Sequence, residues 1–259
     1  MATVILDNVH VEFPIYGAAR SLRSALFASA TGGLVQRDAA RHKRVVVRAL
    51  NGVSFTLRDG DRLGLVGGNG AGKSTLLKVM AGIYRPVAGQ VRVSGRITPC
   101  LNLLPGLDPE DTGYDNIVTG GLFLGLTRAA IERKIPDIEE LSGLGEYLAL
   151  PVRTYSAGML ARLGFALATA VEPGILLVDE GIGAGDASFA ERAARRRQGL
   201  VDQSSILVLA SHADDLIRSW CNKAALLEGG RLRLIGEVDE VLEAYHSGRL
   251  PAQLPAAAE

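Results

Sequence analysis

Apolar residues gather in short runs along this chain, and the runs alternate between strand-like and helix-like spacing. Continuous apolar runs predict strands that are buried on both faces of a sheet. Such strands are expected at residues 61–66, 175–180, 205–210 and 224–228. Helical spacing is found at residues 73–81, 155–168 and 238–245. Strands that alternate with helices in this way predict an α/β fold with a doubly wound sheet.

The N-terminal part of the chain is richer in β-forming residues than in helix formers. Strands are expected at residues 3–13, 45–47, 53–57 and 89–95. Between the first two, residues 17–44 are small and basic. Apolar and small side chains at 22, 25, 26 and 29 would share one helical face, so this segment is either a short amphipathic helix or a surface insertion.

Residues 102–160 have a different character, since helical segments there are divided by prolines and no strand pattern is visible. The prolines are Pro105, Pro109, Pro136 and Pro151. We therefore expect a helical subdomain at about 102–160, inserted into a single α/β domain that spans residues 1–246. Residues 247–259 contain two prolines and several alanines, and we expect a loose tail.

Composition narrows the function classes. The 28 basic and 28 acidic residues balance, so no overall field attracts nucleic acid or an anionic membrane. Cys100 and Cys221 lie outside any metal-ligand spacing, which is typical of reduced thiols in the cytosol. No apolar run approaches the roughly 18 residues of a membrane span, and the N-terminus lacks signal-peptide features. We expect a soluble, intracellular chain that needs a partner for any work at a membrane.

A glycine-rich loop follows the strand at 61–66 and opens the next helix. Gly67, four further residues and then Gly72, Lys73 and Ser74 match the phosphate-binding loop pattern. The loop and first helical turn comprise Gly67, Gly68, Asn69, Gly70, Ala71, Gly72, Lys73, Ser74 and Thr75. Their backbone amides would form an anion site, with Lys73 on the terminal phosphates and Ser74 on Mg²⁺. The loop predicts binding of a nucleoside triphosphate.

Three further groups could act on that nucleotide. Asp179 and Glu180 end an apolar strand, where one carboxylate could hold Mg²⁺ and the other could activate the attacking water. Ser156 and Gly158 open a helix and could form a second anion site, although the pentapeptide at 155–159 taken alone favours an ordinary helix cap at Ser156. His212 follows the strand at 205–210, where it is either structural or a donor to the γ-phosphate.

Taken together, and in their order along the chain, the phosphate loop and these three groups resemble the motifs of the ATP-binding subunits of ABC transporters. Residues 67–75 match the Walker A loop, residues 155–159 the signature, Asp179 and Glu180 the Walker B motif with its catalytic glutamate, and His212 the switch histidine. The resemblance implies a P-loop NTPase core with an N-terminal antiparallel β-subdomain and an inserted helical subdomain. It also implies a head-to-tail homodimer that places each ATP between the Walker A loop of one copy and the signature of the other. An aromatic residue would stack on adenine, and Phe13 or alternatively Tyr16 fits that place.

Departures from the usual motifs refine the resemblance. The signature reads Tyr-Ser-Ala-Gly-Met, Asn102 stands where a Mg²⁺-contacting glutamine is usual, and residues 106–117 are similar to those of bacterial polysaccharide exporters. This resemblance implies an ATPase that drives a separate polytopic membrane permease from the cytoplasmic face of the inner membrane and moves a lipid-linked polysaccharide. We expect no nucleic-acid partner and, since only residues 247–259 follow the last helix, no direct polysaccharide binding. The alternatives are a non-transport ABC ATPase acting on ribosomes or DNA, or an ABC motor for another substrate.

Overall fold

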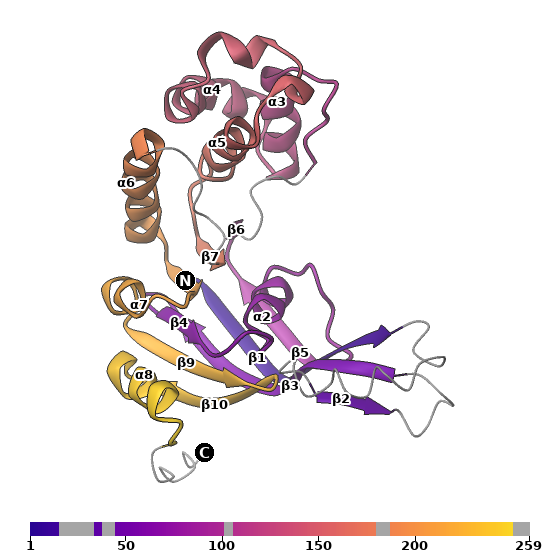
Figure 1. Cartoon of the computed structure of the whole chain (residues 1–259), viewed down its shortest axis with the longest axis vertical. Coiled ribbons are helices and arrows are strands. Elements are labelled where there is room, and N and C mark those ends of the chain that lie inside the picture. The colour runs from indigo at the N-terminus through magenta and orange to yellow at the C-terminus, as the bar shows by residue number, and fades with distance from the viewer. Residues whose placement is uncertain (16–33, 38–44, 101–105, 180–186, 251–259) are drawn as a thin grey trace. The chain divides into compact units, whose positions relative to one another are not determined.

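The computed structural model describes residues 1–15, 34–37, 45–100, 106–179 and 187–250. The chain divides into two compact units. The first comprises Met1–Gly95 and Ser205–Glu259, and the second comprises Arg96–Ser204. Figure 1 labels the α-helices and most of the strands of both units.

The first unit contains an antiparallel sheet with the strand order β2-β3-β1-β5. Its strands are β1 (Thr3–Ile15), β2 (Leu34–Arg37), β3 (Val45–Arg58) and β5 (Ala88–Ser94). The buried side chains of β1 and β3 include Val4, Leu6, Leu50 and Leu57. This sheet is the expected antiparallel β-subdomain.

The same unit also contains parallel strands. In this part, β4 (Arg62–Val66) lies between β8 (Ile206–Ala210) and β9 (Lys223–Glu228) and runs parallel to both, while β10 (Arg231–Gly236) pairs antiparallel with β9. The helices are α2 (Lys73–Met80), α7 (Asp214–Trp220) and α8 (Val238–Ser247). Helix α8 packs on β9, β10 and β4, and α2 packs on β3, β5 and β8. Figure 1 shows α8 beside β9 and β10. Strands β4, β8 and β9 are almost wholly buried, as their continuous apolar runs predict.

The second unit is mainly helical. Within its described residues, strands β6 (Ile97–Cys100) and β7 (Ile175–Asp179) pair in parallel. Its α-helices are α3 (Gly113–Phe123), α4 (Arg128–Ser142), α5 (Ala157–Ala168) and α6 (Ala187–Gln203), joined in part by the short 3₁₀ helices η2 (Gly145–Ala149) and η3 (Val152–Thr154). Helices α3, α4 and α5 share one apolar core that includes Ile117, Ile131 and Phe165. Residues 106–160 contain no strand, as predicted, and the α/β fold with a helical insertion is confirmed.

Several boundaries differ from the prediction. Residues 34–37 form strand β2, whereas a helix or a surface insertion was expected for residues 17–44. The two strands expected at 45–47 and 53–57 are one strand, because Gly52 adopts φ +73° at a bulge and β3 continues through it. Strands β6 and β10 were not predicted.

Pro136 was expected to separate two helices, but it lies inside α4. It removes one backbone hydrogen bond and frees the carbonyl group of Glu132, four residues earlier. Both residues are exposed, so water can bind that carbonyl. The buried side chains of Ile131 and Ile138 hold the helix on either side of the proline.

Candidate nucleotide site

The glycine-rich loop connects β4 to α2, and glycine is required at two of its positions by close backbone contacts. At Gly67, with φ +147°, a Cβ atom would lie 2.2 Å from the carbonyl oxygen of Leu227 in β9. At Gly72, with φ +108°, a Cβ atom would lie 2.7 Å from the carbonyl oxygen of Ala49 in β3. Glycine therefore allows the loop to fit between these two strands.

The Lys73 ammonium group lies on the inner side of this loop. Its Nζ atom donates to the carbonyl oxygen of Gly67 at 2.5 Å, lies 3.3 Å from that of Gly68, and lies 3.3 Å from Nε2 of His212. Only 9% of Lys73 is exposed. The loop thus holds a buried positive charge beside its own backbone.

The N-terminus of α2 is available to an anion. Gly72 is the N-cap residue, it has no side chain to cap the helix, and the first turn carries no acidic residue. The first amide groups of a helix have no partner within the helix and lie at the positive end of its dipole. Together with Lys73, they supply the N–H donors and the positive charge that a phosphate site would need.

The other loop residues surround this site. Gly68, Asn69 and Gly70 are exposed, whereas Ala71 is buried. Ser74 is exposed on the first turn of α2. Its hydroxyl oxygen is a hard oxygen ligand of the kind that Mg²⁺ prefers. Thr75 is half-buried.

His212 lies in the turn between β8 and α7. The hydroxyl oxygen of Ser211, which is buried, accepts a hydrogen bond from the backbone amide of Ala213 at 3.0 Å and so orders this turn. The structure therefore brings two of the predicted site residues, Lys73 and His212, into contact.

Phe13 lies near the end of β1 and contacts an aromatic residue that the sequence analysis did not identify. The ring centroids of Phe13 and Tyr84 are 5.2 Å apart, and the ring planes meet at 72°. Nζ of Lys78, in α2, lies 5.6 Å from the centroid of Tyr84. No motif in the sequence around Tyr84 indicated this contact.

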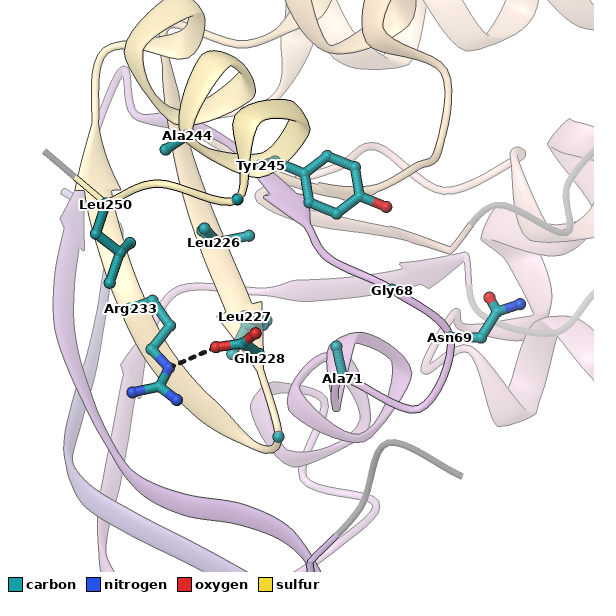
Figure 2. A pocket seen from close by; sticks show the side chains of 12 residues that line it. Gly68, Asn69, Ala71, Leu226, Leu227, Glu228, Arg233, Ala244, Tyr245 and Leu250 are labelled. Atoms are coloured by element: carbon teal, nitrogen blue, oxygen red, sulfur yellow. Dashed lines mark ion pairs between the residues drawn. The ribbon is translucent and has the colours of Figure 1, made fainter. Parts of the chain in front are cut away.

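A pocket of about 350 Å³ lies beside the outer part of the loop. Gly68, Asn69 and Ala71 line one part of it. Figure 2 shows the ring of Tyr245, from α8, at another side, and the ion pair between Arg233 and Glu228 below it. The Arg233 Nε atom lies 3.0 Å from Glu228 Oε2. The sequence gave no sign of this pocket because its walls come from three distant segments.

In the second unit, Ser156 is the N-cap of α5. Its hydroxyl oxygen accepts a hydrogen bond from the amide of Met159 at 3.2 Å. Gly158 is exposed, and a Cβ atom there would meet nothing nearer than 3.9 Å. Tyr155 is buried and donates its hydroxyl hydrogen to the carbonyl oxygen of Tyr147 at 2.6 Å, while burial raises the pKa of the Tyr155 hydroxyl. The signature segment is thus anchored by Tyr155, with Ser156 and Gly158 at an accessible helix start.

Of the remaining predicted site residues, the structure describes Asp179. Asp179 is the last residue of β7 and is half-buried. Glu180, Asn102 and Tyr16 lie outside the described residues.

The segment 106–117 is organised around Asn116, which is 1% exposed. Its side-chain oxygen accepts from the amide of Asp108 at 2.8 Å, and its side-chain nitrogen donates to the carbonyl oxygens of Asp108 and Thr112, each at 2.9 Å. The Tyr114 hydroxyl donates to Glu139 in α4, and this bond is the main cause of the raised pKa of Tyr114. Sequence reasoning did not identify Asn116 as the residue that holds this segment.

Among the described helices, none is both long enough and apolar enough to cross a bilayer.

Comparison with known proteins places these features in a family. The family model for the ABC transporter matches residues 50–183. The O-antigen export system ATP-binding protein RfbE of Yersinia enterocolitica is 47% identical over 231 residues, which are 89% of this chain and 96% of that protein. The protein of the same description, RfbB, from Myxococcus xanthus is 37% identical over 261 residues; the match spans all of this chain but 59% of that relative's length.

Solved structures agree with the fold. The ATP-binding cassette MJ0796, a dimer in a post-hydrolysis state bound to ADP and Pi, matches with a TM-score of 0.65 and 18% identity over 91% of this chain and 98% of that chain. The resemblance predicted from the motifs is confirmed, and the chain belongs to the ABC transporter family of ATP-binding subunits.

Proposed function

We propose that this chain is the ATP-hydrolysing motor of an exporter that moves a lipid-linked, O-antigen-like polysaccharide across the inner membrane. The observation that carries this proposal is the 47% identity, over nearly the whole of both chains, to a subunit named for O-antigen export. The buried Lys73 at an uncapped helix N-terminus supports the ATP-binding part of the proposal.

The nucleotide roles follow from the loop. The backbone amides from Gly68 to Thr75 and the Lys73 ammonium group would bind the β- and γ-phosphates. Phe13, or alternatively Tyr16, would stack on adenine. Mg²⁺, held by Ser74, Asp179 and Asn102, would neutralise charge on the phosphate oxygens.

Catalysis requires a proton acceptor and a donor to the γ-phosphate. Glu180 would accept the proton of the attacking water. His212 would donate to a γ-phosphate oxygen as negative charge develops there. Its position 3.3 Å from Lys73 supports this role, because both groups would then act on the same terminal phosphate.

The second anion site would act across a dimer. Because Ser156 and Gly158 lie at the start of α5, their amides and the Ser156 hydroxyl could meet the γ-phosphate held by a second copy of the chain. The solved dimer of similar fold supports this arrangement.

The membrane partner would be a separate polytopic permease, with this chain bound at its cytoplasmic face as one domain spanning residues 1–246. Contact would run through residues 102–120, of which the segment 106–117 is ordered by Asn116, and through the insertion at 17–44.

Purification from membranes tests this proposal. The chain should copurify with a polytopic membrane protein, and the complex should hydrolyse ATP. Lys73→Ala should prevent ATP binding and turnover without releasing the partner, because Lys73 is in the nucleotide site. Copurification with ribosomes or DNA in place of a membrane protein would contradict the export role and favour a non-transport ABC ATPase.

A further inference from the structure

The contact between Phe13 and Tyr84 joins two parts of the first unit that are distant in sequence. Phe13 belongs to β1 and pairs with Val47 of β3, whereas Tyr84 follows α2. Their centroid separation of 5.2 Å and interplanar angle of 72° are within the range of favourable edge-to-face aromatic pairs. Both side chains are half-buried, so neither ring is enclosed in the core.

Tyr84 is fixed to the end of the helix that begins at the phosphate loop. Its amide donates to the carbonyl oxygen of Lys78 at 3.2 Å, and the amide of Ile83 donates to the same oxygen at 2.9 Å. The Lys78 ammonium group lies 5.6 Å from the centroid of the Tyr84 ring, within cation–π range. Three residues later, the amide of Val87 donates to the carbonyl oxygen of His10 in β1 at 2.8 Å. Tyr84 is thus held from α2 on one side and from β1 on the other.

Helix α2 therefore connects two parts of the proposed nucleotide site, one at each of its ends. Lys73 and the loop amides, at its first turn, form the proposed phosphate site, while Tyr84, beyond its last turn, contacts Phe13, one of the two rings proposed to stack on adenine. Eight helical residues span about 12 Å, a rigid spacer between the two parts.

We propose that Tyr84 is a positioning residue for the base platform, holding the Phe13 ring at a fixed place relative to the phosphate loop. This inference rests on the proposed role of Phe13 in adenine stacking. A ring that is already ordered loses less conformational entropy when the base binds, so the pair should strengthen binding of the nucleoside and leave binding of the phosphates unchanged.

The experiment compares Mg-ATP with inorganic triphosphate, which has the phosphates but no base. Equilibrium dissociation constants for both are measured by calorimetry on wild type, Phe13→Ala, Tyr84→Ala, Tyr84→Phe and the double variant Phe13→Ala with Tyr84→Ala. Ile83→Ala is the matched control, because Ile83 is an exposed side chain in the same turn. Thermal melting of each variant confirms folding, and Tyr84→Leu replaces Tyr84→Ala if the alanine variant does not fold.

We expect Tyr84→Ala to raise the Kd for ATP roughly two- to tenfold, the range that one aromatic pair supports. The Kd for triphosphate should stay at the wild-type value. Tyr84→Phe and Ile83→Ala should bind ATP normally, and the double variant should be no worse than Phe13→Ala alone, because Tyr84 acts through Phe13.

Each contrary outcome has a distinct meaning. If Phe13→Ala weakens ATP binding and Tyr84→Ala does not, the positioning role is wrong while the adenine assignment stands. If Phe13→Ala leaves ATP binding unchanged, the base platform is elsewhere and the inference fails with it. If Tyr84→Ala weakens ATP and triphosphate equally, Tyr84 supports the loop generally and is not a positioning residue for the base. If wild type binds neither compound, the proposed ATP function itself fails.

Discussion

The Lys73 ammonium nitrogen lies 3.3 Å from Nε2 of His212, although 139 positions separate the two residues in sequence. Strands β4 and β8 pair in parallel, so the segments that follow them emerge at the same edge of the sheet. The pairing explains why a histidine with no local motif lies beside the phosphate loop.

We predict that His212→Ala lowers ATP turnover roughly a hundred- to a thousandfold, the effect of removing one donor to a developing negative charge. ATP binding should change little, because Lys73 and the loop amides remain. Steady-state hydrolysis and calorimetric ATP binding on the same preparation check this. Normal turnover by the variant would assign His212 a structural role.

The capping role of Ser156 can be separated from its proposed contact with ATP. Aspartate caps a helix as well as serine does, so Ser156→Asp should keep the thermal stability of wild type. Its carboxylate would repel the γ-phosphate of a second copy, so ATP-dependent dimerisation of a Glu180→Gln background should be lost. Ser156→Ala removes the cap and should destabilise the fold by about 1 kcal/mol.

Gel filtration with Mg-ATP and thermal melting measure the two properties separately. If Ser156→Asp in the Glu180→Gln background dimerises with Mg-ATP as readily as Glu180→Gln alone, Ser156 is a helix cap and no part of a shared site.

The two cysteine thiols should be almost inert in the native protein. Burial raises the pKa of Cys100 and of Cys221 to about 12, whereas an unfolded cysteine titrates near 8.5. At pH 8 the native thiolate fraction is smaller by roughly a thousandfold, so iodoacetamide should modify both thiols that much more slowly than in denaturant. Mass spectrometry of timed samples measures this.

The same shift sets a pH dependence of stability. Because the native pKa is raised, the thiols contribute to stability below about pH 8.5, and this contribution is lost as pH rises toward about 12.

In the iodoacetamide experiment, modification of native and denatured protein at equal rates would contradict the burial of these residues.

The sequence predicted the fold best where one physical signal dominated. The apolar runs of β4, β8 and β9 predicted buried strands because both of their faces are covered. Strand β10 was missed although Gly229 and Gly230, with φ of +54° and +75°, form the turn of a hairpin and the residues after them alternate between charged and apolar. Strand β6 was missed because it contains Pro99, which donates no backbone hydrogen bond.

In the candidate site, too, some features were predicted from the sequence and others were missed. The phosphate loop was predicted because its glycines meet local backbone demands that appear as a continuous motif. Tyr84, Tyr245 and Asn116 were missed because their roles depend on contacts with residues from other segments, which a single sequence does not show.

Asp108 allows contact with the membrane partner to be tested apart from folding. Asn116 holds the backbone of Asp108, whose carboxylate accepts a local hydrogen bond from the amide of Glu110 at 2.9 Å and has no other side-chain bond within the described residues. Asp108→Ala should therefore leave stability and basal ATPase unchanged while reducing export. Tyr114→Phe, which removes the hydroxyl that binds Glu139, should reduce export in the same way.

Asn116→Ala is the contrasting variant, since it leaves buried backbone groups unpaired and should destabilise the fold by about 1–3 kcal/mol. Export assays in cells, with ATPase and melting measurements on the purified chain, distinguish these effects. Loss of basal ATPase in Asp108→Ala would show that this segment serves the nucleotide site.

In the proposed function, ATP hydrolysis by this chain drives polysaccharide across the membrane. The most direct test replaces the wild-type chain with Glu180→Gln in its native host and measures lipid-linked polysaccharide on the cell surface and in the inner membrane. The amide cannot accept the proton of the attacking water, so ATP should still bind but turnover should stop. We predict that surface polysaccharide disappears and that its lipid-linked form accumulates in the inner membrane. Normal surface polysaccharide in cells that carry only Glu180→Gln would contradict the account.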